Sequence, residues 1–174
     1  EPQVCSAMYR DDGSLELWAS SQDPRGGREL VSETLGIPRD KIHVNLERIG
    51  GGFGRRHMHD PIVEVAWIAR EVGRPVQLLW TREDDMRHDF YRPAAWHHFK
   101  AGIDDGGRMV AFDHHFVTFG RDGRPVSGAG LSENHYPAGL VPNFRFRQSL
   151  VDTNVPTGPW RSPGHSAFCW AYQS

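Results

Sequence analysis

The sequence feature that most constrains the fold is the glycine-rich run Gly50-Gly51-Gly52-Phe53-Gly54-Arg55-Arg56. Before it, Ile42, Val44 and Leu46 alternate with polar residues, as in a half-buried strand, and after it Asp60-Pro61 opens a helical pattern. Consecutive glycines let the backbone approach a ligand, and a loop that leads into a helix presents unpaired N–H groups to an anion. The run therefore predicts a loop that holds a phosphate or the polar edge of a cofactor. The alternative is a tight turn with solvated arginines.

The residues around this run argue against several classes of ligand. No Gly-Lys-Ser/Thr follows it, as a P-loop requires, and its glycines lack the spacing of a dinucleotide fold. A net charge of -2 without a Lys/Arg-rich stretch argues against nucleic acid as a partner. The apolar stretches are too short to span a membrane. The two cysteines, Cys5 and Cys169, have no CxxC spacing, and a disulfide between them is left open.

The first half of the chain alternates between strand and helix patterns. Apolar and polar residues alternate after the turn at Gly13, which predicts a strand over residues 14–21. Pro24 can begin a helix, and Gly36 and Pro38 can end it, which predicts a helix over residues 24–35. The segment after the glycine-rich run predicts a second helix over residues 61–72 and a short strand over residues 76–80.

The second half is rich in β-forming residues. Residues 97–103 and 109–119 flank a polar turn, which predicts an antiparallel hairpin, and residues 144–152 predict a further strand. Residues 120–142, rich in Gly, Pro and Ser, form a long loop of the kind that is functional or packs on a neighbour. A chain of 174 residues is long enough for one core. We therefore expect one α+β domain over residues 1–174, with a mixed sheet and two flanking helices.

Seven different short motifs follow one another along the chain. They are Glu1-Pro2-Gln3, Trp18-Ala19-Ser20-Ser21-Gln22, Leu35-Gly36-Ile37-Pro38, the run Gly50 to Arg56, Gly73-Arg74-Pro75-Val76, Trp80-Thr81-Arg82-Glu83-Asp84-Asp85-Met86 and Trp160-Arg161-Ser162-Pro163-Gly164. In this order and spacing they resemble the large, molybdopterin-binding subunits of the xanthine dehydrogenase/aldehyde oxidase family. The double arginine and the acidic segment after Trp80 most resemble the isoquinoline oxidoreductase beta subunit and membrane-associated aldehyde dehydrogenases. The resemblance implies the first cofactor-binding domain of molybdenum hydroxylases.

The resemblance also implies roles for individual residues. Gln22 matches the glutamine whose amide bonds an oxygen ligand of molybdenum. Gly51, Gly52, Phe53 and Gly54 match the loop whose N–H groups reach the metal's oxo face and the pterin, with the Phe53 ring as a wall beside the substrate. Arg161 matches an arginine in a third segment that faces the metal. Structural alternatives for these residues are a solvent-exposed glutamine, a core phenylalanine and a surface arginine. No catalytic residue and no protein ligand to a metal is assigned.

Two departures from the family pattern bear on activity. Purine-oxidising members carry a glutamate four residues after the loop phenylalanine, where this chain has His57. Xanthine is therefore not the expected substrate, and aldehydes or aromatic N-heterocycles are. The family's catalytic glutamate lies far towards the C-terminus beside a second cofactor-binding domain, beyond Ser174. We therefore expect a partial domain whose isolated chain is inactive.

The resemblance implies a molybdopterin cofactor, in its cytosine dinucleotide form for bacterial members. The implied partners are an iron–sulfur small subunit and the remaining cofactor-binding domain, because two cysteines cannot ligate a four-cysteine cluster. Self-association is left open, as is the compartment, periplasm or cytoplasm of a bacterium. The alternative function is a stand-alone, non-catalytic binding or structural module with the same fold.

Other candidate sites are weaker. The pairs His97-His98 and His114-His115 fall in predicted strands, where neighbouring side chains point to opposite faces, so a histidine metal site is not expected. The charged run between Arg82 and Arg87 reads as a salt-bridged cap after a strand rather than as a pair of catalytic carboxylates.

Overall fold

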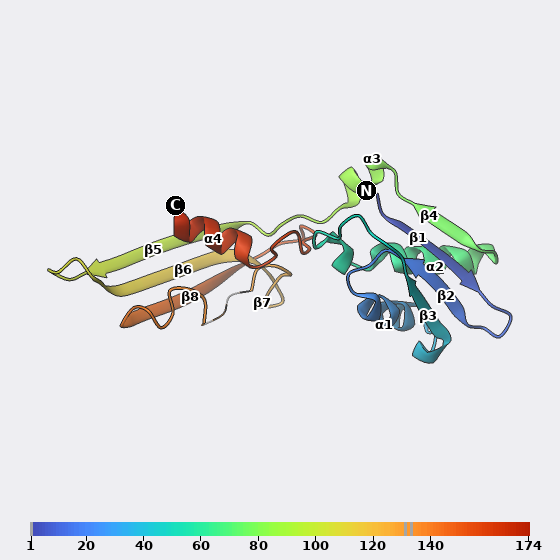
Figure 1. Cartoon of the computed structure of the whole chain (residues 1–174), viewed down its shortest axis with the longest axis horizontal. Coiled ribbons are helices and arrows are strands. Elements are labelled where there is room, and N and C mark those ends of the chain that lie inside the picture. The colour runs from blue at the N-terminus through green and yellow to red at the C-terminus, as the bar shows by residue number, and fades with distance from the viewer. Residues whose placement is uncertain (1, 131, 133) are drawn as a thin grey trace. The chain divides into compact units, whose positions relative to one another are not determined.

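The computed structural model describes residues 2–130, 132 and 134–174, so that Glu1 of the first motif and residues 131 and 133 of the long loop lie outside the described residues. The chain divides into two compact units, Glu1–Asp89 (the N-terminal unit) and Phe90–Ser174 (the C-terminal unit). Each unit has its own four-stranded sheet (Figure 1). Among the described residues, the strands of each unit pair within that unit, so the chain has two sheets where one was expected.

The sheet of the N-terminal unit has the strand order β3-β2-β1-β4. Its strands are β1 (Val4–Tyr9), β2 (Leu15–Ala19), β3 (Ile42–Leu46) and β4 (Val76–Leu79). β1 pairs antiparallel with β2 and with β4, whereas β2 pairs parallel with β3. The parallel pair needs a crossover connection, and the first helix of the chain supplies it.

Two helices cover one face of this sheet, α1 (Pro24–Leu35) and α2 (Asp60–Val72). The Asp23 carboxylate accepts a hydrogen bond from the Gly26 N–H at 3.0 Å and caps α1. Both helices have a proline in their first turn and end at a glycine in the left-handed conformation. The structure confirms both predicted helices and the predicted mixed sheet that they flank.

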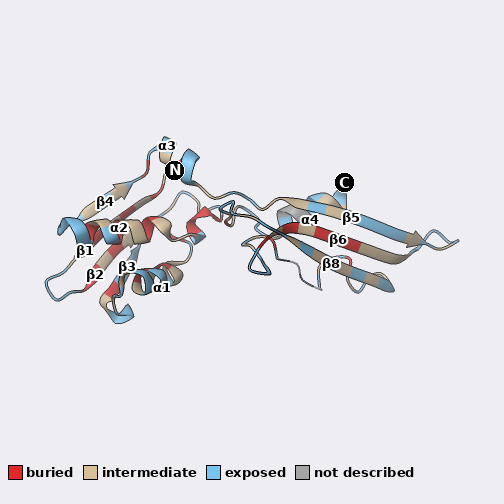
Figure 2. Ribbon diagram, turned by 180° about the vertical axis from the view of Figure 1, so that it is seen from behind, coloured by how far each residue is buried: buried red, intermediate tan, exposed pale blue. Residues whose placement is uncertain are grey.

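The core of the N-terminal unit lies between the sheet and these two helices. One face of β1, β2 and β3 meets apolar residues of α1 and α2, and the buried side chains form one cluster. Figure 2 marks the buried stretches of these strands in red. Its members are Cys5, Ala7, Leu15, Leu17, Ala19, Val31, Ile42, Ile62, Val65, Ala66 and Ala69. The period-two pattern of the strands and the helical spacing of α2 thus meet in one apolar layer.

The C-terminal unit is built on a three-stranded core of long strands. These are β5 (Ala95–Ile103), β6 (Met109–Arg121) and β8 (Asn143–Asp152), with a short β7 (Arg124–Pro125) beside β6. β5 and β6 form the predicted antiparallel hairpin, and β8 pairs parallel with β6 over ten residue positions. Helix α4 (His165–Gln173) places Phe168 and Tyr172 against the aromatic face of this sheet.

Three longer elements escaped prediction: β1, α4 and helix α3 (Arg82–His88). Helix α3 occupies the charged run that was interpreted as a cap. The capping is real, because Thr81 and Asp84 bond reciprocally in a capping box, but a helix follows it. Two short 3-10 helices complete the element order, Arg39–Lys41 and Arg55–His57.

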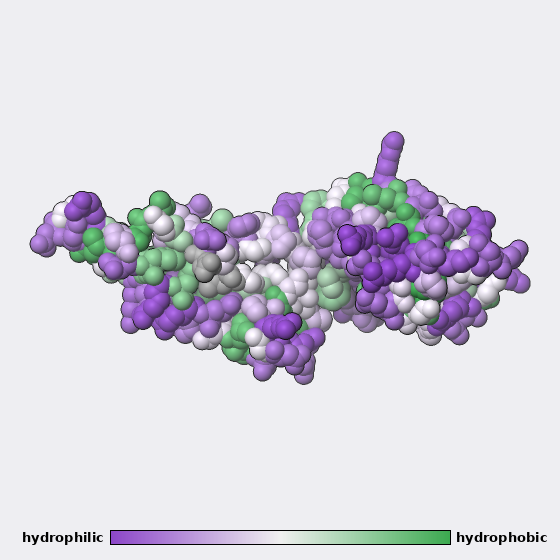
Figure 3. All heavy atoms as spheres, turned by 90° about the horizontal axis from the view of Figure 1, so that it is seen from below, coloured by the Kyte–Doolittle hydropathy of each residue, from purple (hydrophilic) through white to green (hydrophobic). Residues whose placement is uncertain are grey.

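The surface seen in Figure 3 is mostly hydrophilic, with small hydrophobic patches on both units. Within the residues that the structure describes, no helix has the length and apolar character needed to cross a bilayer. Both cysteines are free, with Cys5 buried and Cys169 exposed.

Candidate functional site

Gln22 and the glycine loop, residues 50–54, lie together in the N-terminal unit. The Gly54 N–H donates to Gln22 Oε1 at 2.9 Å, and the Gln22 N–H donates to the Arg56 carbonyl at 2.9 Å. Because Oε1 accepts from the loop, the remaining polar group of this amide, Nε2, is a donor. The structure thus joins two residues that lie 32 positions apart in the sequence.

A side chain at position 52 would collide with Gln22. A Cβ built on Gly52 would lie 2.2 Å from Gln22 Cδ, a distance that real Cβ atoms do not show. Gly52 therefore permits a close approach that any other residue would prevent. Gln22 and the glycine loop are therefore in direct contact.

Phe53 adopts a conformation that bulky residues avoid. Its φ is 52°, in the left-handed region, and its side chain is half exposed at 50%. Such a conformation costs on the order of 1–3 kcal/mol and persists only where the surrounding structure holds it. Phe53 is therefore neither a core residue nor a relaxed surface residue, and its ring is presented at the surface by a held backbone.

The loop also offers hydrogen-bond donors. Within the part of the chain that the structure describes, the N–H groups of Gly51 and Gly52 have no protein acceptor. Together with the Gln22 amide, they are donors that can meet an oxyanion or a polar cofactor edge. This set of donors therefore fits the oxygen-rich edge of a molybdopterin-type ligand.

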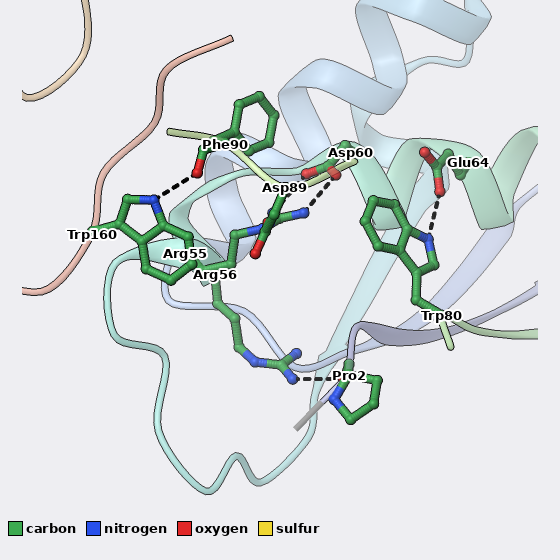
Figure 4. A network of polar contacts seen from close by, with 9 residues as sticks. All are labelled: Pro2, Arg55, Arg56, Asp60, Glu64, Trp80, Asp89, Phe90 and Trp160. Atoms are coloured by element: carbon green, nitrogen blue, oxygen red, sulfur yellow. Dashed lines mark hydrogen bonds and ion pairs between the residues drawn. The ribbon is translucent and has the colours of Figure 1, made fainter. Parts of the chain in front are cut away.

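Arg55 follows the loop and is buried, with only 5% of its side chain exposed. Its guanidinium forms a bidentate pair with Asp60 at 2.9 and 2.8 Å, bonds Asp89 through Nε, and lies 5.6 Å from the Trp80 ring centre (Figure 4). Burial alone would lower the pKa of this guanidinium, but the bonds to Asp60 and the charge of Asp89 raise it overall. The arginine is a permanently charged and fully partnered anchor.

Arg56 is buried as well and uses its side chain differently. Nη1 donates to the Ser20 carbonyl at 3.0 Å. Nη2 donates to the Pro2 carbonyl at 3.2 Å, as Figure 4 shows. Its own carbonyl accepts from the Gln22 N–H and from the Ser21 hydroxyl. The interpretation of the run as a turn with solvated arginines is therefore wrong.

Acidic residues gather near Arg55 at the start of α2 and along α3. Burial raises the pKa of Glu64, which accepts from the Trp80 Nε1 at 3.0 Å. Burial, and then the charge of Asp89, raises the pKa of Asp85. Within the described residues, Asp85 Oδ1 is buried without a hydrogen-bond partner, and no group of three or more acids, histidines or cysteines is arranged to hold a metal ion.

Arg161 belongs to the C-terminal unit, where its carbonyl accepts from Arg92 Nη2 at 2.9 Å. Trp160, next to it, donates its Nε1 to the Phe90 carbonyl at 2.8 Å, so that the segment is tied to the start of this unit. The proximity of Arg161 to Gln22 and Phe53 stays a prediction.

Two histidines of the C-terminal unit, His97 and His114, form a hydrogen-bonded chain with Tyr172. His97 Nδ1 lies 2.9 Å from His114 Nε2, and His114 Nδ1 lies 2.8 Å from the Tyr172 hydroxyl. The two rings stack at 5.1 Å among Phe99, Phe116 and other aromatic side chains. His98 and His115 lie on the opposite face of the sheet, as strand geometry predicts.

Comparison with known proteins identifies the family. The family model for the molybdopterin cofactor-binding domain matches residues 1–174. This chain belongs to that family. The molybdopterin cofactor-binding domain is part of the xanthine dehydrogenase/aldehyde oxidase group of oxidoreductases, as the motifs had indicated.

Among curated relatives, the beta subunit of isoquinoline 1-oxidoreductase from Brevundimonas diminuta is 35% identical over 115 residues, covering 66% of this chain and 15% of that protein. Xanthine dehydrogenase from Emericella nidulans is 32% identical over 168 residues, covering 89% of this chain and 12% of that protein. This domain therefore spans only about an eighth of the length of such relatives.

Solved structures share the fold. Quinoline 2-oxidoreductase from Pseudomonas putida 86 superposes with a TM-score of 0.79 and 24% identity, covering 96% of this chain and 22% of that one. Aldehyde oxidoreductase from Desulfovibrio gigas gives a TM-score of 0.75 and 22% identity, covering 94% and 18%. At these identities the likeness concerns the fold alone.

The sequence predicted roles for Gln22 and the glycine loop, which the structure places in contact, but it did not predict the contributions of Arg55 and Arg56. Both arginines belong to the glycine-rich motif, but the sequence did not predict that they are buried. The available signal was their position directly after a glycine loop and before Asp60, whose spacing of five residues from Arg55 suits a local ion pair.

Proposed function

We propose that this molybdopterin cofactor-binding domain is one wall of the cofactor site in a molybdenum hydroxylase that oxidises aromatic N-heterocycles or aldehydes. The observation that carries the proposal is the contact between Gln22 and the glycine loop, which brings the glutamine amide and the loop backbone together. The matching family model and the names of the relatives support the reaction class.

The cofactor, when bound, supplies the redox chemistry that inserts a water-derived oxygen into a substrate C–H bond. The chain supplies donors and shape. Gln22 Nε2 and the N–H groups of Gly51 and Gly52 bind oxygen atoms, and the half-exposed Phe53 ring forms an apolar wall that orients a flat substrate. Arg161 would add a donor from the third motif.

The finer assignments follow from the same resemblance. We propose the cytosine dinucleotide form of the cofactor, an iron–sulfur small subunit that receives the electrons, and further polypeptide that completes the site and brings the general base. His57 replaces the glutamate of purine-oxidising members and is exposed, which favours a substrate without the xanthine pattern of polar groups.

The test is to purify the chain from a host that makes the cofactor, and to measure bound molybdenum by elemental analysis. Oxidation of an aldehyde or an N-heterocycle would be assayed with a dye acceptor. We expect weak, substoichiometric molybdenum and no turnover, since a cofactor held by one wall loses part of its contacts and a missing base costs about 10²–10⁴-fold. Gly52→Ala should abolish the residual molybdenum.

Two other outcomes would change the proposal. No molybdenum in either the original chain or Gly52→Ala would favour a stand-alone module without the cofactor. Stoichiometric molybdenum with repeated turnover would show that the chain carries a base of its own.

A further inference from the structure

We propose that Arg55 and Arg56 are positioning residues that hold Phe53 and Gln22 in the geometry needed to meet the cofactor. This inference rests on the proposed function for its purpose, but its structural content is independent of whether a cofactor binds. It assigns a task to two buried side chains that follow the loop.

The first step of the argument is the strained backbone of Phe53. A bulky residue at φ 52° relaxes to an ordinary conformation unless its neighbours on both sides are fixed. On the C-terminal side the loop continues at once into Arg55 and Arg56, both 4% exposed. On this side of Phe53, two buried side chains in succession therefore oppose the relaxation of the loop.

The second step is that the two arginines fasten different parts of the unit. Arg55 joins the loop to Asp60 at the start of α2 and to Asp89 after α3. Arg56 joins the loop to Ser20 at the end of β2 and to Pro2 before β1. The loop is thus attached to the helices through Arg55 and to the sheet through Arg56. A movement of the loop would have to break one of these two sets of bonds.

The third step concerns Gln22. The Arg56 carbonyl accepts from the Gln22 N–H, while the Arg56 guanidinium holds the carbonyl of Ser20, two residues before it. Arg56 therefore holds residues 20–22, which include Gln22, through both its own backbone carbonyl and its own side chain. Lysine cannot reproduce either arrangement, because an ammonium is a point charge without the planar fork that bonds a carboxylate bidentately or two carbonyls at once.

The experiment uses amide hydrogen exchange of the full chain, read by mass spectrometry for peptides that cover residues 50–57 and, as the internal reference, residues 4–9 and 15–19. The variants are Arg55→Lys, Arg56→Lys and Arg56→Met. Arg70→Lys is the matched control, because Arg70 is a partly exposed arginine on α2 away from the loop. Asp89→Asn is a milder second variant, which keeps the Arg55–Asp60 pair.

We expect exchange in residues 50–57 to rise about tenfold in Arg55→Lys and Arg56→Lys and further in Arg56→Met, with the reference strands within twofold of the original chain. Asp89→Asn should raise loop exchange less than Arg55→Lys, and Arg70→Lys should change nothing. Molybdenum retained on purification should fall in the same order. Partial rescue by lysine relative to methionine distinguishes fastening of the loop from general packing.

Unchanged loop exchange in Arg55→Lys and Arg56→Lys would overturn the inference, and so would a uniform rise across the loop and the reference strands in Asp89→Asn. Failure of the proposed function has a different signature. The original chain would then hold no molybdenum, while the loop would still loosen in the order given.

Discussion

The two units of this protein bury polar side chains in opposite ways. The N-terminal unit buries charge: Arg55 has a side chain 5% exposed and two carboxylate partners. The C-terminal unit buries neutral histidine, with His114 fully inaccessible and bonded to His97 and Tyr172. It keeps its own arginine–carboxylate cluster, Asp113 with Arg145 and Arg147, on the exposed face of its sheet.

The difference shows that an arginine–carboxylate pair contributes differently to the structure when it is buried and when it is exposed. A charge withdrawn from water must be fully bonded, and then it fixes geometry, as Arg55 does beside the glycine loop. An arginine in water gains little from a carboxylate, because the solvent screens both charges. Changing the buried Arg55 should therefore affect the stability of the N-terminal unit, and changing the buried His114 should affect how the stability of the C-terminal unit depends on pH.

The largest expected effect comes from breaking the buried pair. Arg55→Met leaves Asp60 and Asp89 without their cation, and removal of one partner of a buried ion pair typically costs about 3–5 kcal/mol. The free energy of unfolding of the N-terminal unit, measured by urea titration with exchange readout of residues 4–9, should fall by that amount. Arg145→Met is the control and should leave the unfolding midpoint unchanged. Equal effects in the two variants would contradict the comparison.

The next effect concerns acid and the C-terminal unit. Burial, together with the nearby His97, lowers the pKa of His114 from 6.5 to about 4. A lowered pKa means that the folded state disfavours the proton, so the stabilisation is complete above pH 6.5 and is lost as the pH falls towards 4. The loss across this window should reach about 3 kcal/mol for this one group.

The measurement is the urea midpoint of the C-terminal unit between pH 7 and pH 4. His114→Gln should flatten the pH dependence, because glutamine takes no proton. His115→Gln, on the opposite face of the same strand, is the matched control and should keep it. A pH profile that is the same for His114→Gln and the original chain would show that another group controls the acid response.

How far the sequence alone could predict this molecule follows from the kinds of interaction involved. Local patterns predicted α1, α2 and the β5–β6 hairpin, since prolines, glycines and alternation act over a few residues. The contact of Gln22 with the loop was anticipated through the family resemblance. Helix α3 was missed because a seven-residue charged segment has no apolar periodicity, and its capping box was read as an isolated cap.

Long-range features could not be read from the sequence. The division into two units depends on strand pairings that local patterns do not encode, such as the parallel pairing of β6 with β8 across the long loop. The burial of Arg55 and Arg56 depends on partners as distant as Pro2 and Asp89, which no local pattern selects. A charged residue is expected to be exposed to solvent, and only the three-dimensional structure shows which charged residues are buried.

The smallest expected effect comes from Asp113→Asn. Hydrogen bonds from Arg145 and Arg147 hold the pKa of the Asp113 carboxyl well below its usual range, so it stays ionised throughout the pH window in which the C-terminal unit is tested. The side chains of Arg145 and Arg147 are 66% and 46% exposed, and water replaces the lost carboxylate at little cost. The urea midpoint at neutral pH should therefore not move measurably, and its pH dependence should match that of the original chain. High salt should likewise leave the two proteins alike, since screening weakens a surface pair that contributes little. A midpoint shift as large as that of Arg55→Met would show that this exposed cluster holds the sheet together, and burial would then not be what separates the two sets of arginines.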